Sequence, residues 1–328
     1  MKSKLYSLLE NAENIAIFSH SSPDADALGG SLAFKNIINA NFDGKNVDVF
    51  ADGDISAHYG PMLKQETINP RPFSYYDLAV VLDCPNINRT GKFAEMIRDI
   101  PTIINIDHHE TNTRFGNVNY VTPNVSSTCE MIYLIAKSQK LYIDDTIAKE
   151  LYQGIITDSN CFASPYSTKL THKVAGELMD YNFDANKIKE YYFKNNSIAK
   201  TQLLIKALQS MNFYHDNKVT TMKIDYNTFS SVGATFEDTL GIIDNGININ
   251  GTEVSAILIE IAKNDIYCSL RSKGNVNIGA VAKVFGGGGS TQLGAFQIQG
   301  SLQDIERQIL EQLSPLMPEN MENDEMEF

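Results

Sequence analysis

The chain has 328 residues, enough for two domains with packed cores, and its 43% apolar and 20% charged residues are typical of soluble globular proteins. Its net charge of −13 argues against binding of duplex DNA through a basic surface, although bound metal cations can still attract a small anionic substrate. No segment resembles a transmembrane helix or a signal peptide, so we expect a cytoplasmic protein without a membrane partner. Four separated cysteines, none in a C-x-x-C pair, indicate free thiols in a reducing compartment.

The N-terminal part of the chain alternates between helical and strand patterns. Residues 2–11 have the spacing of a short amphipathic helix, residues 14–20 (NIAIFSH) form an apolar strand, and residues 27–39 are again helical. Further apolar runs predict strands over residues 45–51, 77–83 and 100–107. Because apolar strands that alternate with helices are typical of parallel sheets covered on both faces, we predict an α/β fold.

Acids and histidines follow three of these strands. Open α/β sheets bind their ligands at the carboxyl ends of the strands, so side chains placed there converge on one edge. Adjacent histidines at a strand end point in different directions, so one can bind a metal while the other faces a substrate. We expect the following residues to meet at this edge: His20, Asp24, Asp26, Asp83, Asp107, His108 and His109.

The next segment adds one further candidate ligand. Residues 115–121 predict a strand, Ser126 to Thr128 are good capping residues for a helix through residue 138, and residues 144–156 form another helix. Asp158 follows in a stretch of turn-forming residues. It is either a fourth metal-ligating position or only a turn-capping acid.

Beyond this point the pattern predicts a connector and a second, smaller α/β domain. Residues 168–181 and 185–210 are helical, and the domain boundary is expected between Asn182 and Met211. Three strands are predicted after it, over residues 218–225, 252–262 and 265–271. The acidic end of the chain, residues 318–328, has no periodic pattern and is expected to be disordered.

A run of four glycines in the second domain suggests a phosphate-binding loop. Gly286 to Gly289 follow a predicted helix over residues 278–285 and precede another apolar segment, which disfavours a flexible linker. Exposed backbone N–H groups in such a loop can bind phosphate, and Arg271 and Lys273 would be natural partners.

The chemistry of the candidate ligands points to hydrolysis of phosphoesters. Histidines and carboxylates without thiolates favour Mn²⁺ or Mg²⁺ over Zn²⁺, Fe²⁺ or Co²⁺. The acids suffice for two ions about 3.5–4 Å apart, which would activate a water molecule and stabilise the transition state of an in-line displacement. No Walker loop is present, and Cys84 is better interpreted as a buried thiol than as a nucleophile.

Six segments of the sequence resemble known motifs. HSSPDADALGG, VVLDCPN, INIDHHETN and GIITDSNCF resemble the four motifs of the DHH phosphoesterase superfamily, and SLRSKG with VFGGGGSTQLGAF resembles its DHHA1 substrate-binding domain. The length is most similar to the NrnA-type group, which hydrolyses short oligoribonucleotides to 5′-mononucleotides and removes the 3′-phosphate of adenosine 3′,5′-bisphosphate (pAp). The resemblance implies a parallel-sheet DHH domain (1–185), a helical linker (186–212) and a smaller α/β DHHA1 domain (213–317), with the active site in the cleft between them.

The resemblance also implies roles for individual residues. His20, Asp24 and Asp83 would hold one metal ion, and the second ion would be held by Asp26, Asp83, His108 and Asp158. His109 would face the scissile phosphate or the leaving oxygen, with Asp107 behind it as an orienting residue. The terminal phosphate would be bound by Arg271, Ser272, Gly286, Gly287, Gly288, Gly289 and Ser290.

One residue departs from the family pattern. Where the family has a histidine directly after the glycines, this chain has Ser290, and the Ala-Ala-Gly that follows is replaced by Leu293-Gly294-Ala295. Serine can donate one hydrogen bond to a phosphate but carries no charge. We therefore expect weaker binding of the terminal phosphate or a changed substrate preference, with the metal chemistry unaffected.

Several alternatives stay open at the level of sequence. The enzyme could act on linear or cyclic dinucleotides (pApA, cyclic di-AMP), or the chain could be a non-catalytic nucleotide-binding regulator. A pyrophosphatase is disfavoured by the C-terminal motifs, and an exonuclease of long single strands by the lack of an added domain and a basic channel. The expected partner is a short single-stranded RNA or a small nucleotide, and the expected cofactor is a pair of Mn²⁺ ions, with Mg²⁺ or Co²⁺ as alternatives. The sequence leaves a homodimer open.

Overall fold

The structure, a computed structural model, describes residues 3–53, 55 and 67–317. The chain divides into two compact units, Met1–Asn195 and Asn196–Phe328, which are described separately below. The predicted acidic tail at residues 318–328 lies outside the described residues. None of the helices among the described residues has the length and hydropathy needed to cross a membrane.

The first unit is built on a parallel sheet, as predicted. The strands pair in the order β2-β1-β3-β4-β5, and every pair is parallel. β3 is buried along its whole length, which agrees with its uninterrupted apolar sequence LAVVL. The strands are β1 (Asn14–Phe18), β2 (Asn46–Phe50), β3 (Leu78–Leu82), β4 (Ile103–Asp107) and β5 (Val118–Val121).

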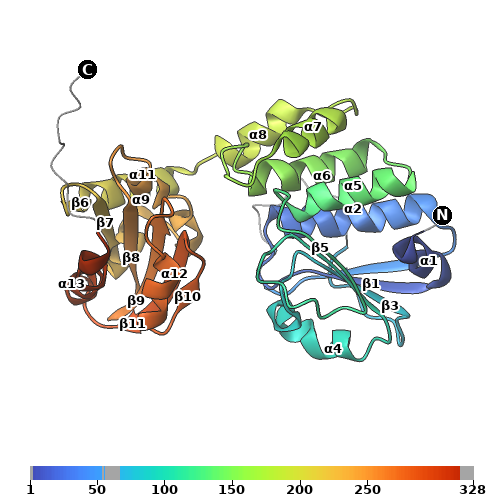
Figure 1. The fold of residues 1–328 in the computed structure, drawn as a ribbon, viewed down its shortest axis with the longest axis horizontal. Coiled ribbons are helices and arrows are strands. Elements are labelled where there is room, and N and C mark those ends of the chain that lie inside the picture. The colour runs from blue at the N-terminus through green and yellow to red at the C-terminus, as the bar shows by residue number, and fades with distance from the viewer. Residues whose placement is uncertain (1–2, 54, 56–66, 318–328) are drawn as a thin grey trace, which may run out of the picture. The chain divides into compact units, whose positions relative to one another are not determined.

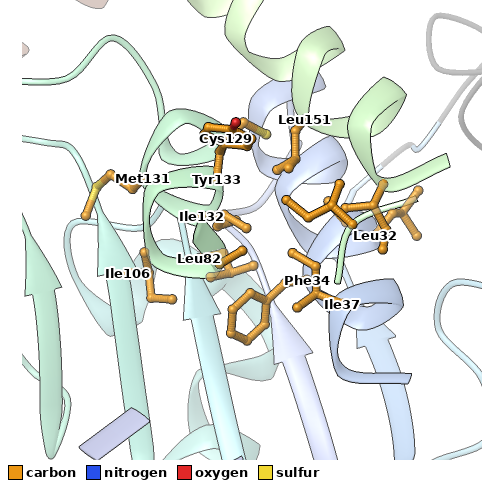
Figure 2. Close-up of a cluster of buried hydrophobic side chains, with 14 of the residues drawn as sticks. Leu32, Phe34, Ile37, Leu82, Ile106, Cys129, Met131, Ile132, Tyr133 and Leu151 are labelled. Atoms are coloured by element: carbon orange, nitrogen blue, oxygen red, sulfur yellow. The ribbon is translucent and has the colours of Figure 1, made fainter. Parts of the chain in front are cut away.

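Both faces of this sheet are covered (Figure 1). Side chains alternate between the two faces along each strand, so Leu82 and Ile106 join the core on one face while Val81 joins the core on the other. Figure 2 shows part of the larger core, where Leu82 and Ile106 face Ile132. The helices of the larger core include α1 (Lys4–Asn11), α2 (Ala25–Asn41), α5 (Thr128–Gln139) and α6 (Asp145–Asp158). The other face packs against the 3-10 segment η2 (Ile87–Phe93) and α4 (Ala94–Arg98).

The helical segment near the domain boundary is broken, which corrects the prediction of one helix over residues 185–210. The structure has α8 (Ala185–Phe193) and α9 (Ile198–Gln209), after α7 (Lys169–Leu178). Lys194 has a non-helical backbone, and Ser197 caps the new helix by accepting a hydrogen bond from the N–H of Lys200. An internal helix cap competes with continuation of the preceding helix, so the segment restarts instead of running through.

The second unit is a six-stranded mixed sheet with helices on both faces. Its order is β10-β11-β9-β8-β7-β6, in which only β7 and β8 pair in parallel. The strands are β6 (Asn212–Tyr214), β7 (Val219–Ile224), β8 (Val254–Ala262), β9 (Asp265–Ser272), β10 (Gly288–Gly289) and β11 (Leu293–Gln299). One core includes side chains of α12 (Ile278–Val284) and α13 (Leu302–Leu313). The opposite core includes side chains of α9 and α10 (Tyr226–Val232).

The state of the cysteines agrees with the prediction. All four are free thiols, and Cys84, Cys129 and Cys268 are buried, whereas Cys161 is exposed. Burial raises the pKa of the Cys84 thiol to about 12. Cys84 is therefore a buried apolar group and not a nucleophile.

Candidate metal centre

The parallel sheet brings ligand-type side chains from separate segments to one edge. His20 comes shortly after β1, Asp83 directly follows β3, and Asp107 ends β4. These three strands are neighbours in the sheet, so their carboxyl ends lie side by side. The convergence predicted from the sequence therefore has a structural basis in the strand order β1-β3-β4.

Two helices supply further acids. Asp24 is the N-cap of α2 and Asp26 lies in the first turn of that helix. Asp158 is the last residue of α6, which corrects its predicted place in a turn beyond that helix. Ligand atoms lie within 4.8 Å of one another in three groups: His20, Asp24 and Asp83; Asp26, His108 and Asp158; and Asp83, His108 and His109.

The first group surrounds the Nε2 atom of His20. This atom lies 3.8 Å from Asp24 Oδ2 and 3.5 Å from Asp83 Oδ2. On the other side of the ring, Nδ1 lies 3.0 Å from the carbonyl oxygen of Ser21. A carbonyl can only accept, so Nδ1 carries the hydrogen in the neutral ring and Nε2 keeps its lone pair. His20 is thereby prepared to bind a metal through Nε2.

The second group surrounds the Nε2 atom of His108. This atom lies 3.4 Å from Asp83 Oδ1 and 3.4 Å from Asp158 Oδ2. Asp26 belongs to the same group, and its side chain is 1% exposed. Three carboxylates and one imidazole therefore share a small volume.

Asp83 belongs to the first and third groups, and its carboxylate also lies beside His108 of the second. Its Oδ2 faces His20 while its Oδ1 faces His108, which is the arrangement of a carboxylate that bridges two ions. The backbone of Asp83 is left-handed, with φ of 52°, and its N–H donates to the carbonyl of Ile106. A left-handed non-glycine residue is strained by about 1–3 kcal/mol and is held so by its surroundings.

The spacing of these atoms suits metal ligands better than hydrogen bonds. Distances of 3.4–3.8 Å between the imidazole Nε2 atoms and the carboxylate oxygens exceed those of good hydrogen bonds. Ligands bonded at about 2.1 Å to one ion lie about 3.0–3.4 Å apart at octahedral or tetrahedral angles. The two 3.4 Å distances at His108 match this range, and those at His20, 3.5 and 3.8 Å, are slightly longer. The donor set, imidazole nitrogen and carboxylate oxygen without thiolate, fits a divalent ion such as Mn²⁺ or Mg²⁺.

The pKa values of the histidines reflect the crowding of negative charge. Burial favours neutral imidazole, yet the carboxylates of Asp24 and Asp83 raise the pKa of His20 to about 10. The pKa of His108 is likewise raised to about 10, against the effect of burial, by Asp83 and Asp158. Both rings are therefore held in a field that attracts cations.

The carboxylates are shifted in opposite directions. Burial and the nearby charge of Asp83 raise the pKa of Asp26 to about 7, and burial and Asp26 raise that of Asp158. Burial would also raise the pKa of Asp83, but the neighbouring imidazoles of His108 and His20 lower it overall. Of these three carboxylates, Asp83 is therefore the one that stays ionised most readily. The crowded negative charge raises the pKa of Asp26 and Asp158 instead.

Backbone N–H groups at the start of α5 hold Asp26 in place. The sequence predicted Asp26 as a ligand but did not predict this contact. The carboxylate oxygens of Asp26 accept from the backbone N–H groups of Thr128 at 2.7 Å and Cys129 at 3.0 Å. The hydroxyl of Thr128 also donates to Asp83 Oδ1 at 3.1 Å. Residues 126–128 were predicted only as helix caps. The cap itself is Ser127, and Thr128 orients two candidate ligands instead.

His109 belongs to the third ligand group, but its Nδ1 atom is engaged by Asp107. Its Nδ1 lies 2.7 Å from Asp107 Oδ1, compared with 3.6 Å from Asp83 Oδ1. Asp107 is fully buried, whereas the His109 side chain is 41% exposed. With Nδ1 engaged by the carboxylate, the Nε2 atom of His109 is left for a substrate.

The remaining predicted residues belong to the second unit. Arg271 lies in β9 opposite Leu293 of β11, and its guanidinium donates to the hydroxyl of Ser269 and the carbonyl of Leu270. The oxygen of Ser272 accepts from the N–H of Gly274. Gly288 and Gly289 form β10 beside β11, and Gly286 and Gly289 have positive φ. The hydroxyl of Ser290 accepts from the N–H groups of Gln292 at 3.3 Å and Leu293 at 3.2 Å.

Comparison with protein families identifies the class. Residues 14–155 match the DHH family, N-terminal domain, and this range contains five of the six candidate metal ligands. The parallel sheet, the acids and histidines at its edge and this match together define a phosphoesterase, which is a hydrolase. The first unit is therefore similar to the DHH family over residues 14–155.

Relatives of the whole chain carry more specific names. A probable bifunctional oligoribonuclease and PAP phosphatase NrnA of Streptococcus mutans is 29% identical over 281 residues, covering 84% of this chain and 87% of that protein. The bifunctional oligoribonuclease and PAP phosphatase NrnA of Bacillus subtilis is 26% identical over 302 residues, covering 90% and 93%. An exopolyphosphatase-related protein from Bacteroides fragilis has the same fold, with a TM-score of 0.88 over 95% of this chain and 96% of that chain at 23% identity.

Proposed function

We propose that the protein is a two-metal phosphoesterase that hydrolyses short single-stranded oligoribonucleotides to 5′-mononucleotides and converts pAp to AMP. The observation that supports this most strongly is the pair of ligand groups that share Asp83, one on each oxygen of its carboxylate. The names of the relatives from Streptococcus mutans and Bacillus subtilis support the same substrates. Mn²⁺ is the ion we propose, with Mg²⁺ or Co²⁺ able to replace it.

Six residues would hold the two ions. In this proposal His20 Nε2, Asp24 and Asp83 bind one ion, and the other is bound by Asp26, Asp83, His108 and Asp158. Bound there, the ions would supply a hydroxide near neutral pH and neutralise the charge of the phosphate. The chain's own contribution is to fix the carboxylates, through the start of α5 for Asp26 and through Thr128 for Asp83.

His109 is the residue that we propose to face the reacting phosphate. Asp107 holds Nδ1 of the ring and so directs Nε2 outward, where it can donate a proton to the leaving oxygen. Because Asp107 is buried, its hydrogen bond to Nδ1 holds the ring in this orientation. These two residues form a pair of acid and orienting group without serving as metal ligands.

The second unit would supply the contacts that select the substrate. Arg271 offers a guanidinium on β9, and the loop Gly286 to Gly289 offers backbone N–H groups of the kind that bind phosphate. Ser272 and Ser290 add hydroxyl donors. We propose that these residues bind the terminal phosphate, so that one class of substrate is positioned for cleavage.

A panel of substrates tests the proposal. Turnover of pAp, pApA, a five-nucleotide RNA and cyclic di-AMP is measured side by side at fixed Mn²⁺, with Asp83→Asn as the control for contaminating nucleases. The proposal predicts mononucleotide release from pApA and the short RNA, and slower or no release from cyclic di-AMP. Preference for the cyclic dinucleotide would instead assign the chain to that class of phosphodiesterase. No release from any substrate with any divalent ion would favour a nucleotide-binding regulator.

A further inference from the structure

Two asparagines lie behind the segment Asp107-His108-His109: Asn105, which is buried, and Asn112, which is half-buried. Asn105 sits in the middle of the apolar strand β4 and is fully buried. Its amide nitrogen donates to the carbonyls of Val81 and Cys84, each at 3.2 Å. A buried amide in a central strand costs free energy unless its partners are fixed, so its position points to a specific task.

Asn105 accepts a hydrogen bond from Asn112, which lies three residues beyond His109. The amide nitrogen of Asn112 lies 2.8 Å from Asn105 Oδ1, 2.5 Å from Asp107 Oδ2 and 3.2 Å from the carbonyl of Cys84. Its amide oxygen accepts from the backbone N–H of Arg114 at 2.6 Å. The reversed orientation of this amide would place its oxygen against three acceptors, so the network fixes which side donates.

The contacts form a chain that ends at the exposed histidine. Asn105 accepts from Asn112, Asn112 donates to one oxygen of Asp107, and the other oxygen of Asp107 binds Nδ1 of His109. A carboxylate held at one oxygen only can rotate about its χ2 torsion. Held at both, it fixes the plane and the tautomer of the imidazole.

We propose that Asn112 is a positioning residue that acts through Asp107 on His109, with Asn105 holding Asn112 in turn. This inference rests on the proposed function, because it concerns the histidine assigned to the reacting phosphate. Asn112 has a second contact, to the carbonyl of Cys84, beside the strained residue Asp83. If Asn112 had only a structural role, it would act through that contact on the metal ligands. Its substitution would then lower kcat equally with and without His109, whereas a role through His109 predicts a loss of kcat only when His109 is present.

The test is a double-mutant cycle on mononucleotide release from pApA at saturating Mn²⁺. Asn112→Ala lowers kcat by about 10–100-fold, the usual effect of losing an orienting partner, and leaves KM and the Kd of Mn²⁺ within about threefold. In a His109→Ala background the same substitution changes kcat by less than about twofold, because the residue it acts through is gone. Equal losses of kcat in both backgrounds would overturn the inference, as would unchanged kcat in Asn112→Ala alone.

Two further variants keep the test decisive. Asn112→Asp retains the acceptor for the Arg114 N–H but places an acceptor against Asp107, so it should show the same dependence on His109 even if Asn112→Ala folds poorly. Asn119→Ala is the matched control. The side chain of Asn119 in β5 exchanges hydrogen bonds with the backbone of Gly116 and bonds to neither Asp107 nor His109 among the described residues. Its kcat stays within about twofold of wild type. A wild-type protein that releases no mononucleotide would contradict the proposed function, whereas an active wild type with an additive cycle contradicts this inference alone.

Discussion

At the scale of single residues, Asp83 combines a strained backbone with contacts to two candidate metal-binding histidines. It follows a fully buried strand, takes a left-handed backbone and directs one carboxylate oxygen to each ligand group. The strain of that backbone is offset by its hydrogen bond to Ile106 and by Thr128. The strained backbone thus places one carboxylate between the imidazoles of His20 and His108.

Ser290 is the residue on which substrate preference should depend. Ser290→His would restore a side chain able to carry charge, and a charge-assisted hydrogen bond to phosphate is worth about 1.5–3 kcal/mol. We expect the ratio of kcat/KM for pAp to that for pApA to change by about tenfold or more, measured by mononucleotide or phosphate release.

Ser231→His serves as the control for this substitution. Ser231 lies in α10, where its hydroxyl donates to the carbonyl of Thr228, and it is exposed. Its ratio should equal that of wild type. An unchanged ratio in Ser290→His would show that the departure from the family pattern has no role in substrate choice.

At the scale of elements, the close packing of α6 against α5 positions the ligands Asp26 and Asp158. Gly154 lies in α6 where a Cβ atom would come within 2.3 Å of Cys129 Sγ and 2.7 Å of Asp26 Oδ1. Only glycine lets α6 approach this closely while keeping Asp158, one turn further on, at the edge of the sheet. The glycine therefore links helix packing to the geometry of the ligands.

Gly154→Ala should lower both stability and metal binding. Overpacking of this kind costs about 1–3 kcal/mol, and here the atoms that must move include a candidate ligand. Denaturant unfolding measures the first effect and Mn²⁺ titration the second. Gly176→Ala in α7 is the matched control, because a Cβ atom there meets nothing within 4 Å. That variant should gain up to about 1 kcal/mol from helix propensity and bind Mn²⁺ normally. Loss of stability without loss of metal binding in Gly154→Ala would separate packing from the site.

The helices and strands also show which features of the fold and the site can be predicted from the sequence. Apolar runs predict the strands of the parallel sheet, because strand periodicity is a local pattern. His20, Asp83 and His108 follow or end these runs, and parallel strands have their carboxyl ends at the same edge of a sheet. The break between α8 and α9 and the role of Thr128 were missed. Both depend on backbone N–H groups and their acceptors, which a pattern of residue types does not specify.

At the scale of the whole molecule, the net charge is −13, and four of the acids crowd the candidate metal site. Without an ion, protons compensate the crowded carboxylates: the pKa of His20 and His108 is about 10 and that of Asp26 about 7. A metal ion binds the deprotonated forms of these groups. Protons and metal ions therefore compete for the same site.

Metal affinity should therefore rise with pH. The pKa values of His20, His108 and Asp26 are all raised. The two histidines therefore hold protons at neutral pH and Asp26 holds one below about pH 7, and each proton must leave before the ion binds. The Kd of Mn²⁺ should fall as the pH rises from about 6 to about 8.5, with release of protons on binding. Calorimetry in two buffers of different ionisation enthalpy counts those protons. Affinity independent of pH, with no proton release, would contradict the assignment of these residues as ligands.

The most direct test of the central claim is metal-dependent release of AMP from pApA by wild type and by Asp83→Asn. After removal of metal with a chelator, wild-type activity should vanish and return on addition of Mn²⁺. Asp83→Asn, which keeps the size of the bridging side chain but removes its charge, should lose activity by more than the roughly 10–100-fold expected for an orienting residue. Equal release by the two proteins, or release that survives the chelator, would contradict a bridged metal centre at this edge of the sheet.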